Sequence, residues 1–126
     1  MTYRSKFEAN VAKEFKNNGI KFVYEPEVVH FLQPEKARKY TPDFRVTTKG
    51  SRSSFLIETK GRLTAEDRKK LVWVRDQNPK IKLVLLFMDS RKTLTKVSKT
   101  TYGDWSRKNG FEFHDFRFGL PKEWTE

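Results

Sequence analysis

The sequence contains no cysteine and only two histidines, His30 and His114, in 126 residues. Without cysteine the chain forms no disulfide and offers no thiolate as a nucleophile or zinc ligand. Two histidines alone argue against a zinc site, and they nearly exclude a nuclease motif built on a pair of histidines. Any chemistry must therefore come from other side chains.

Long apolar runs, linkers and internal repeats are also missing. No stretch approaches the roughly 20 apolar residues that span a bilayer, and the polar N-terminus lacks the apolar core of a signal peptide. We therefore expect no membrane partner and a protein of the cytoplasm, or of the cytoplasm of a host cell. Residues 1–126 are expected to form a single domain with one hydrophobic core.

Positive charge, in contrast, is abundant. The chain has 27 Lys and Arg against 16 Asp and Glu, a formal net charge of +11. A small domain this basic is attracted to polyanions, of which nucleic acid is the commonest. Solubility alone is the alternative explanation for the charge.

Helical patterns occupy three segments. In residues 5–18 the spacing of Phe7, Val11 and Phe15 predicts an amphipathic helix that ends before Gly19. A second helix is expected from Thr64, its cap, to about residue 78, with Asp67 as the capping partner. A third is expected over residues 101–108.

Strand patterns lie between the helices. Residues 21–32 favour β-structure interrupted by Pro26, and 40–47 and 54–60 predict two strands joined in a hairpin. Residues 81–88 are continuously apolar, which is typical of a strand covered on both faces. Residues 33–39 read as a polar connector. The order predicts an α/β fold with a mixed central sheet flanked by helices.

Glu8 is an acid in an unexpected place. At about 100° per residue it falls within the apolar stripe of the first helix, beside Phe15. One interpretation is structural, because Ser5 and Glu8 match the S-x-x-E capping box. The other is a functional acid at the edge of the core.

Asp43, Glu58 and Lys60 complete the candidate chemistry. Pro42-Asp43 alone is a turn signal. Glu58 and Lys60 flank Thr59, so both project from one face of the same strand. The alternative without function is that Glu58 and Lys60 form a surface ion pair, which would stabilise the fold by about 0–1 kcal/mol.

Together these side chains fit phosphodiester hydrolysis. That reaction needs a water made nucleophilic at neutral pH and compensation for the charge that develops on the phosphate. Carboxylates that hold Mg²⁺ provide both, and a lysine beside them can orient or deprotonate the water or neutralise charge. A hairpin would bring Asp43 and Glu58 together despite their separation in sequence.

Asp43 followed by Glu58-Thr59-Lys60 resembles the pattern of the PD-(D/E)XK nuclease superfamily. Further motifs occur in order along the chain. From about residue 3 to the end they resemble the phage endonuclease I family of Holliday junction resolvases. These motifs are Arg4-Ser5, Gly19-Ile20-Lys21-Phe22, Tyr40-Thr41-Pro42-Asp43-Phe44, Asp67-Arg68-Lys69-Lys70, Ser90-Arg91, Thr101-Tyr102-Gly103 and Pro121-Lys122-Glu123-Trp124.

The resemblance implies a structure-selective endodeoxyribonuclease that resolves branched DNA through paired nicks. It implies a homodimer that exchanges strands through a bridge at residues 32–39, with Glu8 from one chain completing the site of the other. The implied catalytic residues are Glu8, Asp43, Glu58 and Lys60. Mg²⁺, for which Mn²⁺ would substitute, is expected on Asp43, Glu58 and the Thr59 carbonyl, with Glu8 as a further candidate ligand and no small-molecule cofactor.

This sequence also departs from the family pattern at two places. Val23 stands where the family has an acid, and the hairpin at residues 45–54 is longer than in the family. DNA-backbone contacts are expected from Arg4, Ser5, Lys49, Arg52, Arg62, Arg68, Lys69, Lys70, Arg91, Lys92, Lys96 and Lys99. For some of these a solvated surface is the alternative.

Two rival functions stay open. One is a nicking or repair endonuclease that recognises a mismatch or a sequence. The other is a catalytically silent protein that binds DNA junctions. Trp73, Trp105 and Trp124 are expected to pack in the core rather than stack on bases, and His30 to be structural.

Overall fold

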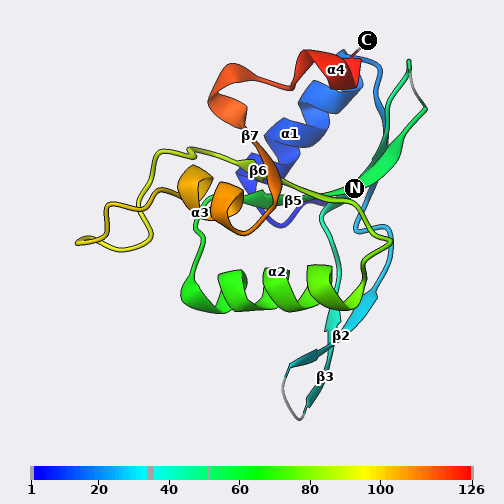
Figure 1. The fold of residues 1–126 in the computed structure, drawn as a ribbon. Helices are drawn as coiled ribbons and strands as arrows, with labels where there is room; N and C mark the ends of the chain where they lie inside the picture. Colours follow the sequence, from blue (N-terminus) through cyan, green and yellow to red (C-terminus); the bar gives the residue numbers. More distant parts are fainter. Residues whose placement is uncertain (1, 34–35, 51, 126) are drawn as a thin grey trace.

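A computed structural model describes residues 2–33, 36–50 and 52–125. Its central sheet has five strands in the order β1-β4-β5-β6-β7 (Figure 1). β1, β4 and β5 are antiparallel, whereas β5, β6 and β7 are parallel. The strands are β1 Lys21–Tyr24, β4 Phe44–Thr47, β5 Ser54–Lys60, β6 Leu83–Phe87 and β7 Glu112–Asp115. The mixed sheet that the sequence predicts is confirmed.

Helices cover both faces of this sheet. α1 (Lys6–Asn17) and α4 (Lys122–Thr125) pack on one face, and Figure 1 shows them close together. α2 (Ala65–Gln77) and α3 (Tyr102–Lys108) pack on the other. Side chains of β5 and β6 alternate between the two clusters, as the period of two in a strand requires. A 3-10 helix, η1 (Phe116–Phe118), joins β7 to the C-terminal region.

α1 follows its sequence pattern. The Ser5 hydroxyl caps it by accepting from the Glu8 backbone N–H. Gly19 then adopts a positive φ of 64°. This conformation lets the N–H of the next residue, Ile20, donate back to the Phe15 carbonyl in the last turn of the helix. Only glycine takes this left-handed conformation without steric cost, so the helix ends where predicted.

α2 and α3 each begin with a complete capping box. In α2 the Thr64 side chain accepts from the Asp67 N–H, and the Asp67 side chain accepts from the Thr64 N–H. Thr101 and Asp104 repeat this arrangement at α3. The predicted cap of α2 is therefore confirmed, and α3 carries a second copy of the same device.

β2 (Val29–Gln33) and β3 (Lys36–Tyr40) form a separate antiparallel hairpin beside α2 (Figure 1). The prediction of a polar connector over residues 33–39 is therefore wrong, because Gln33 and residues 36–39 belong to strands; 34–35 lie outside the described residues. The ladder is hard to read from sequence, because four of the five residues of β3 are exposed and carry no apolar alternation. Contacts to α2 help to fix it, since the Gln77 amide bonds both backbone groups of Leu32.

Residues 40–47 also differ from prediction, because they are not one strand. Tyr40 ends β3, Thr41–Asp43 lie outside any strand, and β4 begins at Phe44. Pro42 has no N–H to donate to a ladder, and the chain passes here from the hairpin to the central sheet.

β6 is buried at all five positions, which confirms the predicted central strand. β7, η1 and α4 were not predicted. Trp105 and Trp124 are buried in the two clusters and Trp73 packs against one, as expected. Within the described residues no helix combines the length and apolar character needed to cross a bilayer.

We predict that Trp124→Ala destabilises the protein by about 3–5 kcal/mol, the usual cost of emptying a buried aromatic site. The Trp124 ring is 2% exposed and lies 5.3 Å from Phe55 and 5.2 Å from His114, centroid to centroid. Urea unfolding measures the effect. Val97→Ala is the control, since Val97 is 93% exposed, and equal stability of the two variants would contradict the packing of α4.

Candidate active site

A polar cavity of about 390 Å³ opens where α1 begins and β5 ends. Its acids are Glu8, Asp43 and Glu58, and its basic side chains are Arg4, Lys39, Lys60 and Lys70. The four predicted catalytic residues, Glu8, Asp43, Glu58 and Lys60, thus come together at one place. All four belong here to the one chain that the structure describes.

Strand register brings the two central acids together. Phe44 pairs with Ile57 across β4 and β5, which places Asp43 opposite Glu58. The Thr59 N–H and hydroxyl both donate to Asp43 Oδ2, at 2.9 and 2.8 Å. The hairpin therefore brings Asp43 and Glu58 together, as its sequence predicts.

Glu58 is held at both carboxylate oxygens. The Tyr40 hydroxyl donates to Oε1 at 2.5 Å, and Lys60 Nζ lies 3.3 Å from Oε2. Glu58 is 6% and Asp43 9% exposed. The interpretation of Glu58 and Lys60 as a surface ion pair is therefore wrong: this pair is largely removed from water.

Lys60 has a second acidic partner. Its Nζ lies 3.2 Å from Asp67 Oδ1, on the first turn of α2. Burial works to lower the Lys60 pKa, but the charges of Glu58 and Asp67 outweigh it, and the pKa of the ammonium is raised. The two acids therefore keep the Lys60 ammonium charged in this site.

The capping-box interpretation of Glu8 is only half met, because its backbone takes part in the cap of α1 and its side chain does not. Its backbone N–H completes the Ser5 cap, while its side chain points away to accept a 2.5 Å hydrogen bond from the Tyr24 hydroxyl. It is 8% exposed, at the cavity wall.

Burial raises the pKa values of both central acids, and the charge of Glu58 raises that of Asp43 further. For Asp43 burial and the charge of Glu58 outweigh the two hydrogen bonds from Thr59 and raise the pKa to about 7. For Glu58 burial raises the pKa against the opposing charge of Lys60. Burial also raises the pKa of the Tyr40 hydroxyl well above its usual range, assisted by Glu58. Tyr40 is therefore a permanent donor.

This pair of carboxylates fits a hard divalent cation. Two adjacent, partly desolvated carboxylates repel each other, and a cation between them relieves that repulsion. Among the described residues no three His, Cys, Asp or Glu side chains close on one point. A cation held by Asp43 and Glu58 would thus keep several waters, as Mg²⁺ commonly does.

Several of these partners were missed in the sequence. Tyr24, Tyr40 and the Thr59 hydroxyl each hold an acid of the cavity. The available signals were the place of Tyr40 in the Tyr40–Phe44 motif and the alternation of β5. Neither signal states which distant carboxylate a hydroxyl will meet.

Val23 does not gain a replacement acid from its own strand. It is 51% exposed and opposite Arg45. β1 ends at Tyr24, and Glu25 takes a positive φ of 47°, so the strand alternation does not continue. Glu25 pairs with Arg4 and Glu27 with Arg45, each at 2.7 Å.

The basic residues expected to contact DNA fall into distinct places. Arg4 and Lys70 line the cavity, and Lys70 Nζ lies 5.2 Å from the centre of the Tyr40 ring. Lys69 and Lys70 also line a neighbouring hollow of about 540 Å³ between α2 and the β2–β3 hairpin. The Ser5 hydroxyl is engaged as a cap.

Other predicted contacts lie farther away. Lys49 and Arg52 are at the tip of the β4–β5 hairpin, the end opposite Asp43, where Lys49 lies over Gly19. Arg62 is exposed after β5, and Arg68 donates to the Leu63 carbonyl. Lys92, Lys96 and Lys99 are exposed on the loop after β6.

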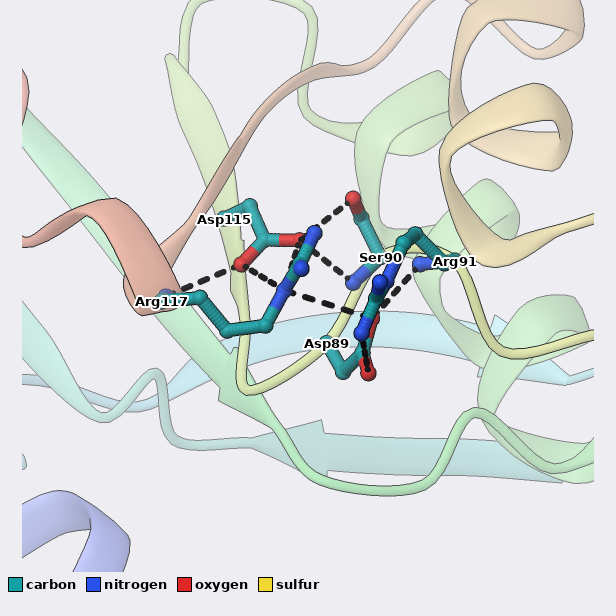
Figure 2. Close-up of polar contacts among 5 residues, drawn as sticks. All are labelled: Asp89, Ser90, Arg91, Asp115 and Arg117. Atoms are coloured by element: carbon teal, nitrogen blue, oxygen red, sulfur yellow. Dashed lines mark hydrogen bonds and ion pairs between the residues drawn. The ribbon is translucent and has the colours of Figure 1, made fainter.

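Figure 2 shows a second polar cluster after β6 and at the end of β7. Asp115 accepts from the N–H and hydroxyl of Ser90, at 2.8 and 2.7 Å, and Arg117 reaches both Asp115 and Asp89. Burial works to raise the Asp115 pKa, but bonds from Arg117 and Ser90 hold it well below its usual range. Arg91, a predicted DNA contact, donates two hydrogen bonds from its guanidinium to the Asp89 carboxylate. The cluster fixes the start of the basic loop.

Comparisons with known proteins identify the family of the chain. The whole chain, residues 1–126, matches the sequence family Phage endonuclease I. Endodeoxyribonuclease 1 of Enterobacteria phage T3 is 40% identical over 113 residues, which cover 90% of this chain and 71% of that protein. Endonuclease I of Escherichia phage T7 is 37% identical over 124 residues, 98% of this chain and 78% of that protein. The resemblance expected from the motifs is confirmed.

The raised pKa of Asp43 predicts a stability change with pH in metal-free protein. The folded pKa is about 7 and the unfolded value about 3.9. The stability that protonated Asp43 contributes is therefore complete below pH 4 and is lost as pH rises through 7. At pH 8 in EDTA, Asp43→Asn should be more stable than wild type by about 2–4 kcal/mol, because one pKa unit is about 1.4 kcal/mol.

Urea unfolding at pH 4.5 and pH 8 tests this, since the advantage of Asp43→Asn should shrink at the lower pH. Asp76→Asn, at an exposed position of α2, is the control. An identical pH dependence in wild type and Asp43→Asn would show that Asp43 is not desolvated as described.

Proposed function

The chain belongs to the phage endonuclease I family, and from this we propose that it is a Mg²⁺-dependent, structure-selective endodeoxyribonuclease that resolves four-way and other branched DNA. The carrying observation is the buried pair Asp43 and Glu58 with Lys60 beside it, at the open end of β5. The names of the T3 and T7 relatives support the endonuclease activity.

In this proposal Asp43 and Glu58 hold Mg²⁺, which Mn²⁺ can replace. The Thr59 carbonyl is a third candidate ligand, and Glu8 acts directly or through water. The bound ion would supply positive charge to a phosphate oxygen and lower the pKa of a water. Thr59 and Tyr40 orient the two carboxylates through the hydrogen bonds described above, as outer-shell partners do in metal sites.

Lys60 acts on the reacting groups. Its ammonium lies against Glu58 at the cavity wall and is 16% exposed. From there it orients the attacking water and compensates negative charge as it develops on the phosphate. Its raised pKa favours the charged form and hence the electrostatic role over proton abstraction.

The basic surface around the cavity would bind the DNA backbone. Lys39 and Lys70 line both the cavity and the neighbouring hollow, so positive charge continues from one to the other. Phosphate contacts of this kind position DNA without reading sequence, which suits a substrate recognised by its branching. Binding should weaken steeply with salt.

We also propose the exchanged homodimer. Glu8 precedes residues 32–39 in the chain, whereas Asp43, Glu58 and Lys60 follow them. If two chains exchanged their N-terminal parts through this segment, the same cavity would form from two chains. Two such cavities in one dimer would explain paired nicks.

Cleavage assays with a four-way junction, a linear duplex and a single strand test the function. We expect Mg²⁺-dependent cutting of the junction in preference to the other two, and none in EDTA. Glu58→Gln and Lys60→Ala should slow cutting by about 100-fold or more, the usual scale for a lost acid–base or charge-stabilising group. Junction affinity measured in Ca²⁺ should remain, because the basic surface is intact.

Other outcomes identify the rivals. Equal cutting of all three DNAs would overturn structure selectivity, and preference for a mismatched duplex would favour the repair endonuclease. Junction binding without cutting in Mg²⁺ would favour the silent binder. Loss of binding in both variants would mean that Glu58 and Lys60 are structural.

Mixed dimers test strand exchange. Glu8→Ala and Asp43→Ala should each be inactive alone, but after the two are unfolded and refolded together, activity should return. In an exchanged heterodimer one cavity carries both substitutions and the other carries neither. If each cavity formed within one chain, both would be damaged and activity would stay absent.

A further inference from the structure

Asp67 connects the start of α2 to the active-site lysine. Its Oδ2 accepts a 3.1 Å hydrogen bond from the Thr64 N–H, while its Oδ1 lies 3.2 Å from Lys60 Nζ. The two oxygens of one carboxylate thus have separate partners. The Asp67 and Lys60 side chains are 23% and 16% exposed, so this is not a surface ion pair.

The capping box fixes the direction of the Asp67 carboxylate. Thr64 both donates to it and accepts from the Asp67 backbone N–H, at 3.1 Å each. Asp67 is therefore anchored to the first turn of a helix whose Leu71 is fully buried in the core. A carboxylate held this way gives a flexible lysine side chain a defined end point.

Lys60 needs such an end point. A lysine side chain loses rotamer entropy when it is held in one conformation, and the other carboxylate beside Lys60 is that of Glu58. Under the proposed function Glu58 also binds Mg²⁺, so its charge is shared between the ion and the lysine. Asp67 is not one of the proposed ligands and remains available to Lys60.

We propose that Asp67 is a positioning residue, which through the capping box of α2 holds Lys60 beside the Asp43–Glu58 pair. The inference rests on the proposed nuclease function and adds a residue to its machinery. It also means that α2 contributes to the reaction through its first turn as well as to the core.

The chain contains its own matched control. Asp104 occupies the same capping-box position in α3, with Oδ2 accepting from the Thr101 N–H at 3.2 Å. Its Oδ1 pairs at 3.0 Å with Arg107, and those side chains are 45% and 67% exposed. The two boxes differ in what the second oxygen holds: the active-site lysine in one and a surface arginine in the other.

The test compares Asp67→Asn with Asp104→Asn. Asparagine keeps the shape and a cap acceptor but loses the charge. We expect Asp67→Asn to cut a four-way junction about 10–100-fold more slowly at saturating DNA, the usual scale for an outer-shell partner. KM and junction affinity in Ca²⁺ should stay within about twofold of wild type, since the DNA-binding surface is unchanged. Asp104→Asn should keep wild-type cutting.

Asp67→Glu provides the rescue. Glutamate is the usual capping-box residue at this position and restores the charge, so we expect more activity than in Asp67→Asn. Melting temperatures of Asp67→Asn and Asp104→Asn should fall by similar amounts, which separates positioning from capping. A kcat for Asp67→Asn within twofold of wild type, or an equal loss of kcat in Asp104→Asn, would overturn the proposal.

A measurement without DNA keeps the two proposals apart. In Glu58→Gln protein we expect NMR relaxation of the Lys60 Cε–Nζ group to report an ordered side chain, which becomes mobile when Asp67→Asn is added and not when Asp104→Asn is added. Unchanged Lys60 mobility would overturn the positioning role even in a protein that cuts DNA. An inactive wild type with the expected mobility change would instead overturn the nuclease function alone.

Discussion

The interaction on which the site depends is the repulsion between two carboxylates held side by side and away from water. Asp43 and Glu58 are each less than a tenth exposed, and burying a charge is costly unless it is paired and hydrogen-bonded. The surroundings meet that requirement incompletely: Thr59 donates twice to Asp43, while Tyr40 and Lys60 hold Glu58. The raised pKa values of Asp43 and Glu58 reflect the part of the cost of burial that these partners do not offset. The fold thus maintains a site that is electrostatically strained without a cation.

Secondary structure distributes these tasks. The alternation of β5 sends Glu58 and Lys60 to one face and Thr59 to the other, so one short strand supplies a carboxylate, a cation and a hydroxyl. Helix starts supply the rest, because Glu8 and Asp67 both lie in first turns whose N-caps they complete. The first turn of a helix is held by its cap, which suits an acid that must stay in place. Capping and site assembly therefore use the same residues.

The parts of the site that could be predicted from the sequence are those that depend on secondary structure. Periodicity reports which face a side chain occupies, and so it located β5, β6, the helices α1 to α3 and the meeting of Asp43 with Glu58. It does not report which hydroxyl meets which carboxylate, and Tyr40 and Thr59 were missed as partners for that reason. The β2–β3 ladder was missed because β3 is mostly exposed and polar, while β2 is positioned partly by the Gln77 amide from α2. The hydroxyl partners and the Gln77 contacts join segments distant in sequence, which periodicity does not report.

On the proposed function, the charge arrangement would allow DNA binding and cutting to be separated in this fold. The chain carries a net charge of +11, yet its buried acids gather where the scissile phosphate would have to sit. Without a cation these acids would repel phosphate at short range, while Lys39, Lys70 and the exposed lysines of the loop after β6 would attract the backbone around it. Affinity then comes from the surroundings and reactivity from the centre. A cation at Asp43 and Glu58 would reverse the local sign and admit the phosphate, so that on the proposed function the metal serves both substrate entry and chemistry.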